Sequence, residues 1–182
     1  MVSAYSQKFG AAGRVDWLNS YQGMLDLLGE AASGNGSQTY RTTNAATYVR
    51  VYNPRAFRCT HAYCFNGTVV TGNIDIGVYD TKGVKIASTG AIAQSGTSQI
   101  QWFALDALIP AGEVILALAG SNPSATLHIP SITSTHLPSG LFNALGWAHQ
   151  STAMPLPDPI TPAELVAIPD NLPIFGVQKR WP

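Results

Sequence analysis

A succession of short alternating segments, separated by turn residues between residues 45 and 130, most constrains the fold of this chain. Ile74, Ile76 and Val78 alternate with other residues, and the stretch from Asp80 to Gly83 leads into a second alternating run. Asp at the first turn position and Gly at the fourth are typical of a type I turn closed by a left-handed glycine. The sequence therefore predicts a β-hairpin here.

Similar strand-like segments recur at intervals of about ten residues, with no crossover helix between them. They cover residues 48–52, 57–65, 98–105, 114–119 and 125–129, and the second of them ends at an Asn-Gly pair. This pattern predicts an all-β fold, an antiparallel β-sandwich of jelly-roll type. Within the segment 98–105, we expect Trp102 to point into the core together with Ile100.

The length of 182 residues suggests one domain with an arm at either end. We expect an N-terminal arm and linker over 1–45, a sandwich core over 46–130 and a proline-rich C-terminal segment over 131–182. In the arm, a helical spacing predicts a short helix capped by Asp16 and formed around Trp17, Tyr21, Met24 and Leu28. Residues 31–38 are predicted to be a flexible linker.

The C-terminal segment differs in composition, since seven of the 12 prolines lie after residue 150. Proline at this density argues against a central strand and favours an extended backbone. A short helix is predicted over 161–168, where Thr161, Pro162 and Glu164 match a capping sequence. Because the segment is also apolar, we expect it to dock on its own domain or on a neighbouring subunit.

Charge excludes some classes of partner. The chain has 10 basic and 10 acidic residues, and only 11% of its residues are charged, against about 25% in an average domain. A net charge of zero argues against electrostatic capture of nucleic acid or of an anionic membrane, so Arg50, Arg55 and Arg58 are expected to pair with carboxylates or to line a subunit contact. We also expect no targeting signal and assembly in a cytoplasm.

The two cysteines are five residues apart, at Cys59 and Cys64. On a regular strand this odd separation predicts opposite faces and α carbons about 16 Å apart, beyond the ~7 Å limit for a disulfide. We therefore expect free, buried thiols. Cys59 and His61 are predicted to share a face, but two ligands are half of a zinc site, so no metal and no cofactor is predicted.

Hydrolytic chemistry finds little support in the sequence, which contains none of the common nucleophile, metalloprotease or phosphate-binding motifs. Asp75 and Asp80 are predicted to lie on opposite faces of a strand, which does not suit the paired carboxylates of a glycosidase. No catalytic residue is predicted, and the protein is expected not to be an enzyme. Three residues remain as candidates for ligand binding: Tyr63, Gln94 and Trp147.

Three segments of the chain resemble a known protein family. They are the hairpin segment 72–90, the Gln/Ser/Gly/Thr-rich loop 93–98 that follows it, and the turn 108–112 before the apolar run 114–119. They resemble the jelly-roll-type domains of tailed-bacteriophage virion proteins. The resemblance covers about residues 45–130 and carries over no catalytic residue. It implies a non-enzymatic virion component, commonly a trimer, that serves as a head decoration or cement protein or as part of a tail appendage.

Together, these observations predict a virion accessory protein that is assembled in the host cytoplasm and binds major capsid or tail proteins. The expected subunit interface consists of Trp17, Tyr21, Met24 and Leu28 of the arm and Ile174, Phe175, Val177 and Trp181 of the tail. The alternative is a tail-fibre or tail-spike tip that binds a host-surface carbohydrate or receptor through Trp147, Tyr63 or Gln94.

Overall fold

The computed structural model describes residues 17–20, 35–39, 43–130, 147–160, 166–167 and 172–179. Within these residues every named strand pairs with an antiparallel neighbour, and there is no helix. The prediction of an all-β, antiparallel fold is therefore confirmed. The jelly-roll connectivity stays a prediction.

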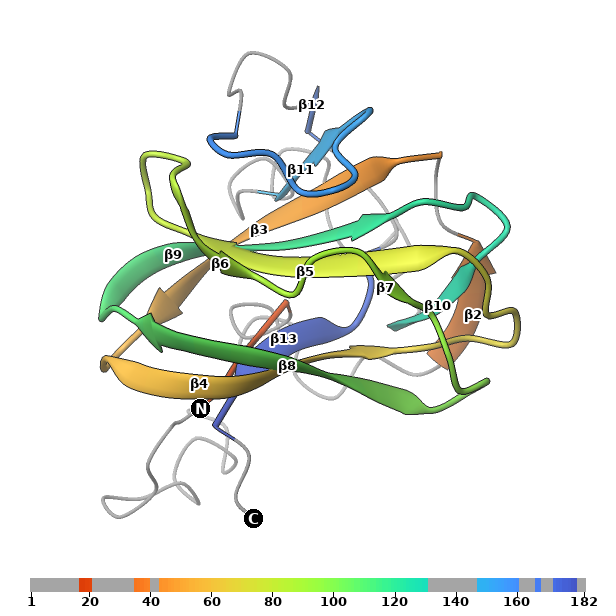
Figure 1. The fold of residues 1–182 in the computed structure, drawn as a ribbon, viewed down its shortest axis with the longest axis horizontal. Helices are drawn as coiled ribbons and strands as arrows, with labels where there is room; N and C mark the ends of the chain where they lie inside the picture. The colour runs from red at the N-terminus through yellow and green to blue at the C-terminus, as the bar shows by residue number, and fades with distance from the viewer. Residues whose placement is uncertain are drawn as a thin grey trace, which may run out of the picture.

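Two large sheets face each other, with a small third sheet at one end (Figure 1). The first has four strands, in the order β1 (Trp17–Asn19), β13 (Phe175–Gln178), β4 (Phe57–Phe65) and β8 (Ile100–Ile109). The small sheet pairs β10 (Thr126–Pro130) with β2 (Asn35–Thr39).

The second large sheet has seven strands and contains the predicted hairpin. Its order is β12 (Val166–Ala167), β11 (Trp147–Gln150), β3 (Ala45–Asn53), β9 (Gly112–Gly120), β5 (Asn73–Tyr79) and β6 (Lys85–Ser88), and β7 (Ile92–Ala93) also pairs with β5. Central strands such as β9, which is paired on both sides, bury side chains on both faces.

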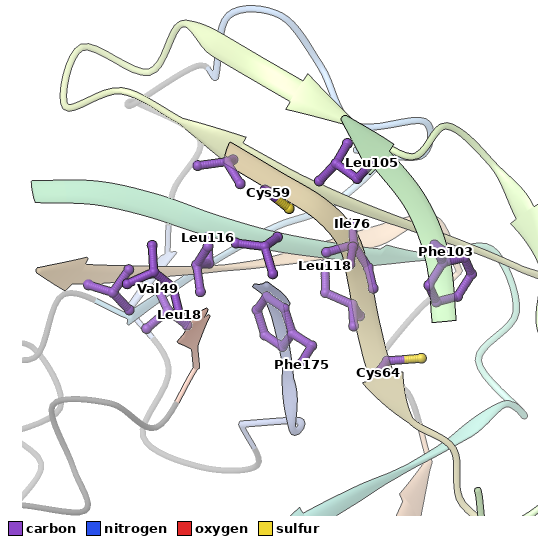
Figure 2. Close-up of a cluster of buried hydrophobic side chains, with 14 of the residues drawn as sticks. Leu18, Val49, Cys59, Cys64, Ile76, Phe103, Leu105, Leu116, Leu118 and Phe175 are labelled. Atoms are coloured by element: carbon purple, nitrogen blue, oxygen red, sulfur yellow. The ribbon is translucent and has the colours of Figure 1, made fainter. Parts of the chain in front are cut away.

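The main hydrophobic core lies between the two large sheets, as in a β-sandwich. Figure 2 shows side chains from both sheets pointing toward one another, among them Leu116 and Leu118 of β9 and Phe175 of β13. Residues Ile74, Ile76 and Val78 of the alternating run are all buried in this core. The apolar alternation thus identified the inward face of β5 correctly.

The turn between β5 and β6 has the predicted chemistry. The Asp80 Oδ1 atom accepts hydrogen bonds from the backbone N–H groups of Lys82 and Val84, each at 2.9 Å. Gly83 has φ +82°, a backbone conformation that residues with a side chain rarely adopt. The predicted β-hairpin is confirmed, with its left-handed glycine.

The predicted facing of the cysteines is wrong, because the pairing of β4 with β8 is irregular. The register shifts between Cys59 and His61, so the side chains that face the core are Phe57 and Cys59 before the shift and Ala62 and Cys64 after it. Both thiols are therefore buried and free, whereas His61 is half-buried and does not share the face of Cys59. A regular alternation cannot anticipate such a bulge.

The predicted orientation of β8 is also wrong. The side chains buried in the core are Phe103, Leu105 and Ile109, while Ile100 is exposed and Trp102 is half-buried on the outer side. Both alternating sets of β8 are largely apolar, so alternation alone does not choose between them. Asp106 lies on the same face of the strand as Trp102, and a charged residue usually marks the face that is exposed to solvent. Asp106 could therefore have indicated the correct orientation of β8.

The described parts of the arm and the tail contribute strands to the same sheets. Trp17–Asn19, at the start of the predicted helix, form β1 and pair with β13, while the rest of that helix lies outside the described residues. Asn35–Thr39, partly within the predicted linker, form β2. In the predicted tail helix, Val166–Ala167 form β12 and the other residues lie outside the described ranges. The boundaries at 45 and 130 therefore do not separate the sheets.

The proline-rich stretch 151–160 lies on the outer face of the seven-stranded sheet, as a strap that docks on its own chain. The Leu156 N–H donates to Asp75 Oδ2 at 3.0 Å, the Leu156 carbonyl accepts from Lys85 Nζ at 3.0 Å, and the Pro157 carbonyl accepts from the Tyr79 hydroxyl at 2.7 Å. Leu156, Ala153 and Ile160 form a second, smaller core with side chains of β3, β5 and β9. The chain itself therefore covers this face around Tyr48 and Tyr79, whereas Tyr52, at the far end of β3, is 65% exposed.

Candidate binding face

The outer face of the four-stranded sheet carries an apolar stripe on β8, which is the outermost strand of that sheet in the described part of the chain. Alternation directs five side chains of β8 outward: Ile100, Trp102, Ala104, Asp106 and Leu108. Ile100 is 49% exposed and Leu108 is 67% exposed. Natural proteins usually protect the outermost strands of a sheet with charged residues, so an apolar stripe at this position indicates a contact surface.

Strand β4 places aromatic side chains beside this stripe. Tyr63 lies directly opposite Trp102 in the register, and their ring centroids are 5.2 Å apart at an interplanar angle of 52°. His61 meets the same indole edge-on, at 6.3 Å and 89°. Burial raises the pKa of Tyr63 to about 12, so its hydroxyl stays neutral at physiological pH. The three half-buried rings form one continuous surface that combines apolar area with polar edges.

Phe65 extends the aromatic surface toward the small sheet. Its position in the register is opposite Ile100. Its ring stacks on the His128 imidazole of β10, with centroids 4.0 Å apart and an interplanar angle of 26°. The surface therefore runs from β8 across β4 to β10.

One ion pair lies at the other end of β4 and β8. Arg58 Nε donates to Asp106 Oδ1 at 2.7 Å and Arg58 Nη2 donates to Asp106 Oδ2 at 2.5 Å, while the two side chains are 70% and 61% exposed. The hydrogen bonds and the charge of Arg58 lower the pKa of the Asp106 carboxyl. Such an exposed pair adds little stability, but it leaves this part of the face without net charge. For Arg58, the prediction of a carboxylate partner is confirmed.

We name the surface made by His61, Tyr63, Ile100, Trp102 and Leu108 the aromatic face. Of these five, the sequence analysis singled out only Tyr63 as a candidate ligand-binding residue. Ile100 and Trp102 were missed because the segment 98–105 was assigned the opposite orientation. Leu108 was placed in the turn 108–112, and His61 was considered only as a metal ligand. Correct placement of Asp106 would have put Ile100, Trp102 and Leu108 on the same side as Tyr63.

Gln94, the second candidate for ligand binding, is a structural residue. It is only 7% exposed. Its Nε2 donates to Asn66 Oδ1 at 2.9 Å and to the Thr126 carbonyl at 3.1 Å, and its Oε1 accepts from the Thr71 N–H at 3.1 Å. The side chain is therefore committed to a buried network and unavailable to a ligand. The third candidate, Trp147, begins β11 and lies opposite Val49 of β3.

Two residues of the expected subunit interface belong to the core instead. Phe175 and Val177 are fully buried between the sheets of their own chain, because β13 pairs with β4 and turns these two side chains inward. Ile174 is partly buried and packs against the same core. Trp17 lies opposite Gln178 in the register. Tyr21, Met24, Leu28 and Trp181 lie outside the described residues.

Three polar side chains among the described residues, those of Asp75, Cys59 and Cys64, are buried. Asp75 is buried beneath the strap, where its Oδ2 accepts the Leu156 N–H. Burial raises the pKa of Cys59 to about 11 and that of Cys64 to about 12, so both thiols stay protonated and are poor nucleophiles. Among the described residues, no three His, Cys, Asp or Glu side chains are grouped so as to hold a metal ion.

No model of a protein family matches the chain, and no curated protein matches it. The described residues contain no helix that is long and apolar enough to cross a membrane.

Proposed function

We propose that this protein is a non-enzymatic accessory protein of a virion, and that it binds other virion subunits through the aromatic face. The virion class rests on the resemblance of segments 72–90, 93–98 and 108–119 to tailed-bacteriophage virion domains. The choice of surface rests on the exposure of Ile100 and Leu108 beside the half-buried rings of Tyr63 and Trp102. This exposure is the observation that carries the proposal.

Coverage by the chain itself supports the aromatic face over the opposite one. The strap 151–160 already buries the centre of the outer face of the seven-stranded sheet, where Leu156 and Ile160 pack with Tyr48 and Tyr79. A partner subunit would have to displace that strap and its hydrogen bonds before it could use the covered face. On the aromatic face, Leu108 and Ile100 lie in solvent already, so a partner gains their burial at no such cost.

The same surface suits association between copies of the chain. Its one described ion pair is internally neutral, and the whole chain carries 10 charges of each sign, so long-range repulsion between copies is weak. The trimeric state, the capsid or tail partner and the virion location are parts of this proposal.

Incorporation into particles tests the proposal. Leu108→Lys places a charge in the expected contact, and we expect it to reduce incorporation at least about tenfold, because burying an unpaired ammonium costs well over the ~1.4 kcal/mol that corresponds to tenfold. The matched control is Val84→Lys, because Val84 is 49% exposed on the β5–β6 hairpin, away from the aromatic face. Equal incorporation of both variants would contradict the proposal.

A second function, recognition of a host-surface carbohydrate by a tail tip, is favoured by the Tyr63–Trp102 pair. Aromatic rings with a polar edge suit the apolar faces of sugar rings, and this pair is partly exposed. A glycan array with the wild-type protein, Trp102→Ala and Trp147→Ala tests this function. Retention of a glycan by the wild type and its loss in Trp102→Ala would favour the carbohydrate function, whereas no retained glycan would leave subunit binding as the function.

A further inference from the structure

A buried Asn-Gly pair lies where β4 ends, at the end of the sandwich next to the small sheet. Asn66 is fully buried and forms an isolated bridge with Leu127 of β10. Gly67 is buried as well. Neither residue belongs to the aromatic face, so an inference about them is independent of the proposed function.

The Asn66 side chain is held by hydrogen bonds on both of its polar atoms. Its Nδ2 donates to the Ser95 carbonyl at 2.6 Å and to Gln101 Oε1 at 3.1 Å. Its Oδ1 accepts from Gln94 Nε2 at 2.9 Å and from Cys64 Sγ at 3.4 Å. This position requires an amide, which supplies two donors and an acceptor together.

Position 67 requires glycine for reasons of space. A Cβ atom built on Gly67 would overlap the side chains of Ser37 and Thr126. The Gly67 N–H donates to the Thr126 carbonyl at 2.9 Å, and the Gly67 carbonyl accepts from the Ser98 N–H at 2.8 Å. Packing and hydrogen bonding therefore hold an asparagine and a glycine next to each other.

This dipeptide is chemically labile wherever the chain is free to move. The backbone nitrogen of the glycine loses its proton and attacks the Cγ of the asparagine, a C–N bond forms, and the side-chain nitrogen leaves as ammonia. Water then opens the cyclic imide to give aspartate or isoaspartate. Glycine hinders the attack least, because it has no side chain.

We propose that Asn66-Gly67 is a latent deamidation site, which the native fold keeps unreactive and which makes opening of this end of the sandwich irreversible. In the fold, the attacking nitrogen is occupied by its bond to Thr126, the Asn66 amide is fixed by its four bonds, and full burial keeps water away. After opening, nothing restrains the attack.

The reaction product does not fit the native site. Aspartate at position 66 would place an oxygen where Nδ2 now donates, opposite the Ser95 carbonyl and Gln101 Oε1, which are both acceptors. Isoaspartate would in addition reroute the backbone through the side chain. A chain that deamidates while open therefore cannot re-form this network, since buried acceptors would face one another without a hydrogen.

The test compares deamidation of the full-length protein in its native state and in urea, in the same mildly alkaline buffer. Peptide mapping by mass spectrometry follows isoaspartate at Asn66, and Asn35-Gly36, the other Asn-Gly pair, shows that the unfolded chain reacts under these conditions. We expect deamidation of Asn66 in the native protein to be at least about tenfold slower than in urea, because buried segments open only rarely. Equal rates in both states would overturn the inference.

Two variants locate the protection in the network. Gln94→Ala removes the donor to Asn66 Oδ1, and we expect faster deamidation at Asn66 under native conditions, whereas Val84→Ala, at an exposed position on the β5–β6 hairpin, should react as slowly as the wild type. Equal native rates for Gln94→Ala and the wild type would contradict protection by the network. Asn66→Asp imitates the product and should unfold at a lower urea concentration than the wild type, and an unchanged urea midpoint would refute the claim of irreversibility.

Discussion

Replacement of Phe175 by alanine distinguishes a core role from an interface role for the C-terminal strand. Phe175 is fully buried in the main core and lies opposite Cys64 in the register of β13 and β4. Its ring points toward Leu116 and Leu118 of the facing sheet (Figure 2). Removal of the ring takes away apolar contacts on both sheets and leaves a cavity that close-packed neighbours fill only in part.

The expected loss is about 3–5 kcal/mol in the free energy of unfolding, the usual range for a buried phenylalanine replaced by alanine. With a urea m-value of about 2 kcal/mol/M, the unfolding midpoint should fall by about 2 M. The whole free energy of unfolding of a domain is about 5–15 kcal/mol, so a domain in the middle of that range keeps about 5 kcal/mol after this loss and still folds in the absence of denaturant.

Urea unfolding followed by tryptophan fluorescence, at two protein concentrations, measures this loss. If Phe175 has a core role, the shift of the urea midpoint should be the same at both protein concentrations. If Phe175 contributed to subunit binding instead, the midpoint would depend on protein concentration. Val84→Ala, at an exposed position on the β5–β6 hairpin, is the control and should shift the free energy by less than about 0.5 kcal/mol. A loss below about 1 kcal/mol for Phe175→Ala, together with a change in oligomeric mass, would refute the core assignment and restore the interface role.

Three further predictions concern the strap and the buried thiols. Gly77→Ala should cost about 1–3 kcal/mol, because its Cβ would lie 2.8 Å from Leu156 Cδ1, and a double-mutant cycle with Leu156→Ala should recover most of that cost. Asp75→Ala should lower the urea-unfolding free energy by about 1–3 kcal/mol, since it leaves the buried Leu156 N–H without its acceptor. Burial raises the pKa of Cys59 from 9.0 to about 11, so the folded state keeps a proton that the unfolded state loses. The thiol should therefore leave the free energy of unfolding unchanged below the pKa of the unfolded state, and should lower it as the pH rises from that pKa to the pKa of the folded state. The urea midpoints of the wild type and of Cys59→Ala, compared across that pH range, measure this loss of stability.

The sequence predicted the strand content of the middle of the chain well, because local chemistry decides it there. The hairpin at Asp80 and Gly83 depends on a carboxylate that caps two N–H groups and on a glycine that adopts positive φ. Both requirements are readable from four consecutive residues. The inward alternation of Ile74, Ile76 and Val78 is likewise local, since a strand with one clear apolar parity has one favoured orientation.

The parts that sequence reasoning missed depend on contacts between distant segments. The bulge after Cys59 reverses the alternation of β4, and it becomes visible only once the partner strand β8 is known. In β8, both parities are apolar, so the packing of Phe103 and Leu105 against the opposite sheet decides which one is buried. The apolar tail was recognised as a docking segment, but only the pairing of β13 with β4 places Phe175 in its own core.

Hydroxyl-radical footprinting of the full-length protein, free and bound in particles, tests the central claim most directly. Ile100 and Leu108 are exposed in the free chain and should be labelled there, then lose labelling when the protein is bound. Val84, which is 49% exposed on the β5–β6 hairpin of the other large sheet, should keep its labelling in both states. Unchanged labelling of Ile100 and Leu108 in the particle, with protection at Val84 instead, would contradict the account.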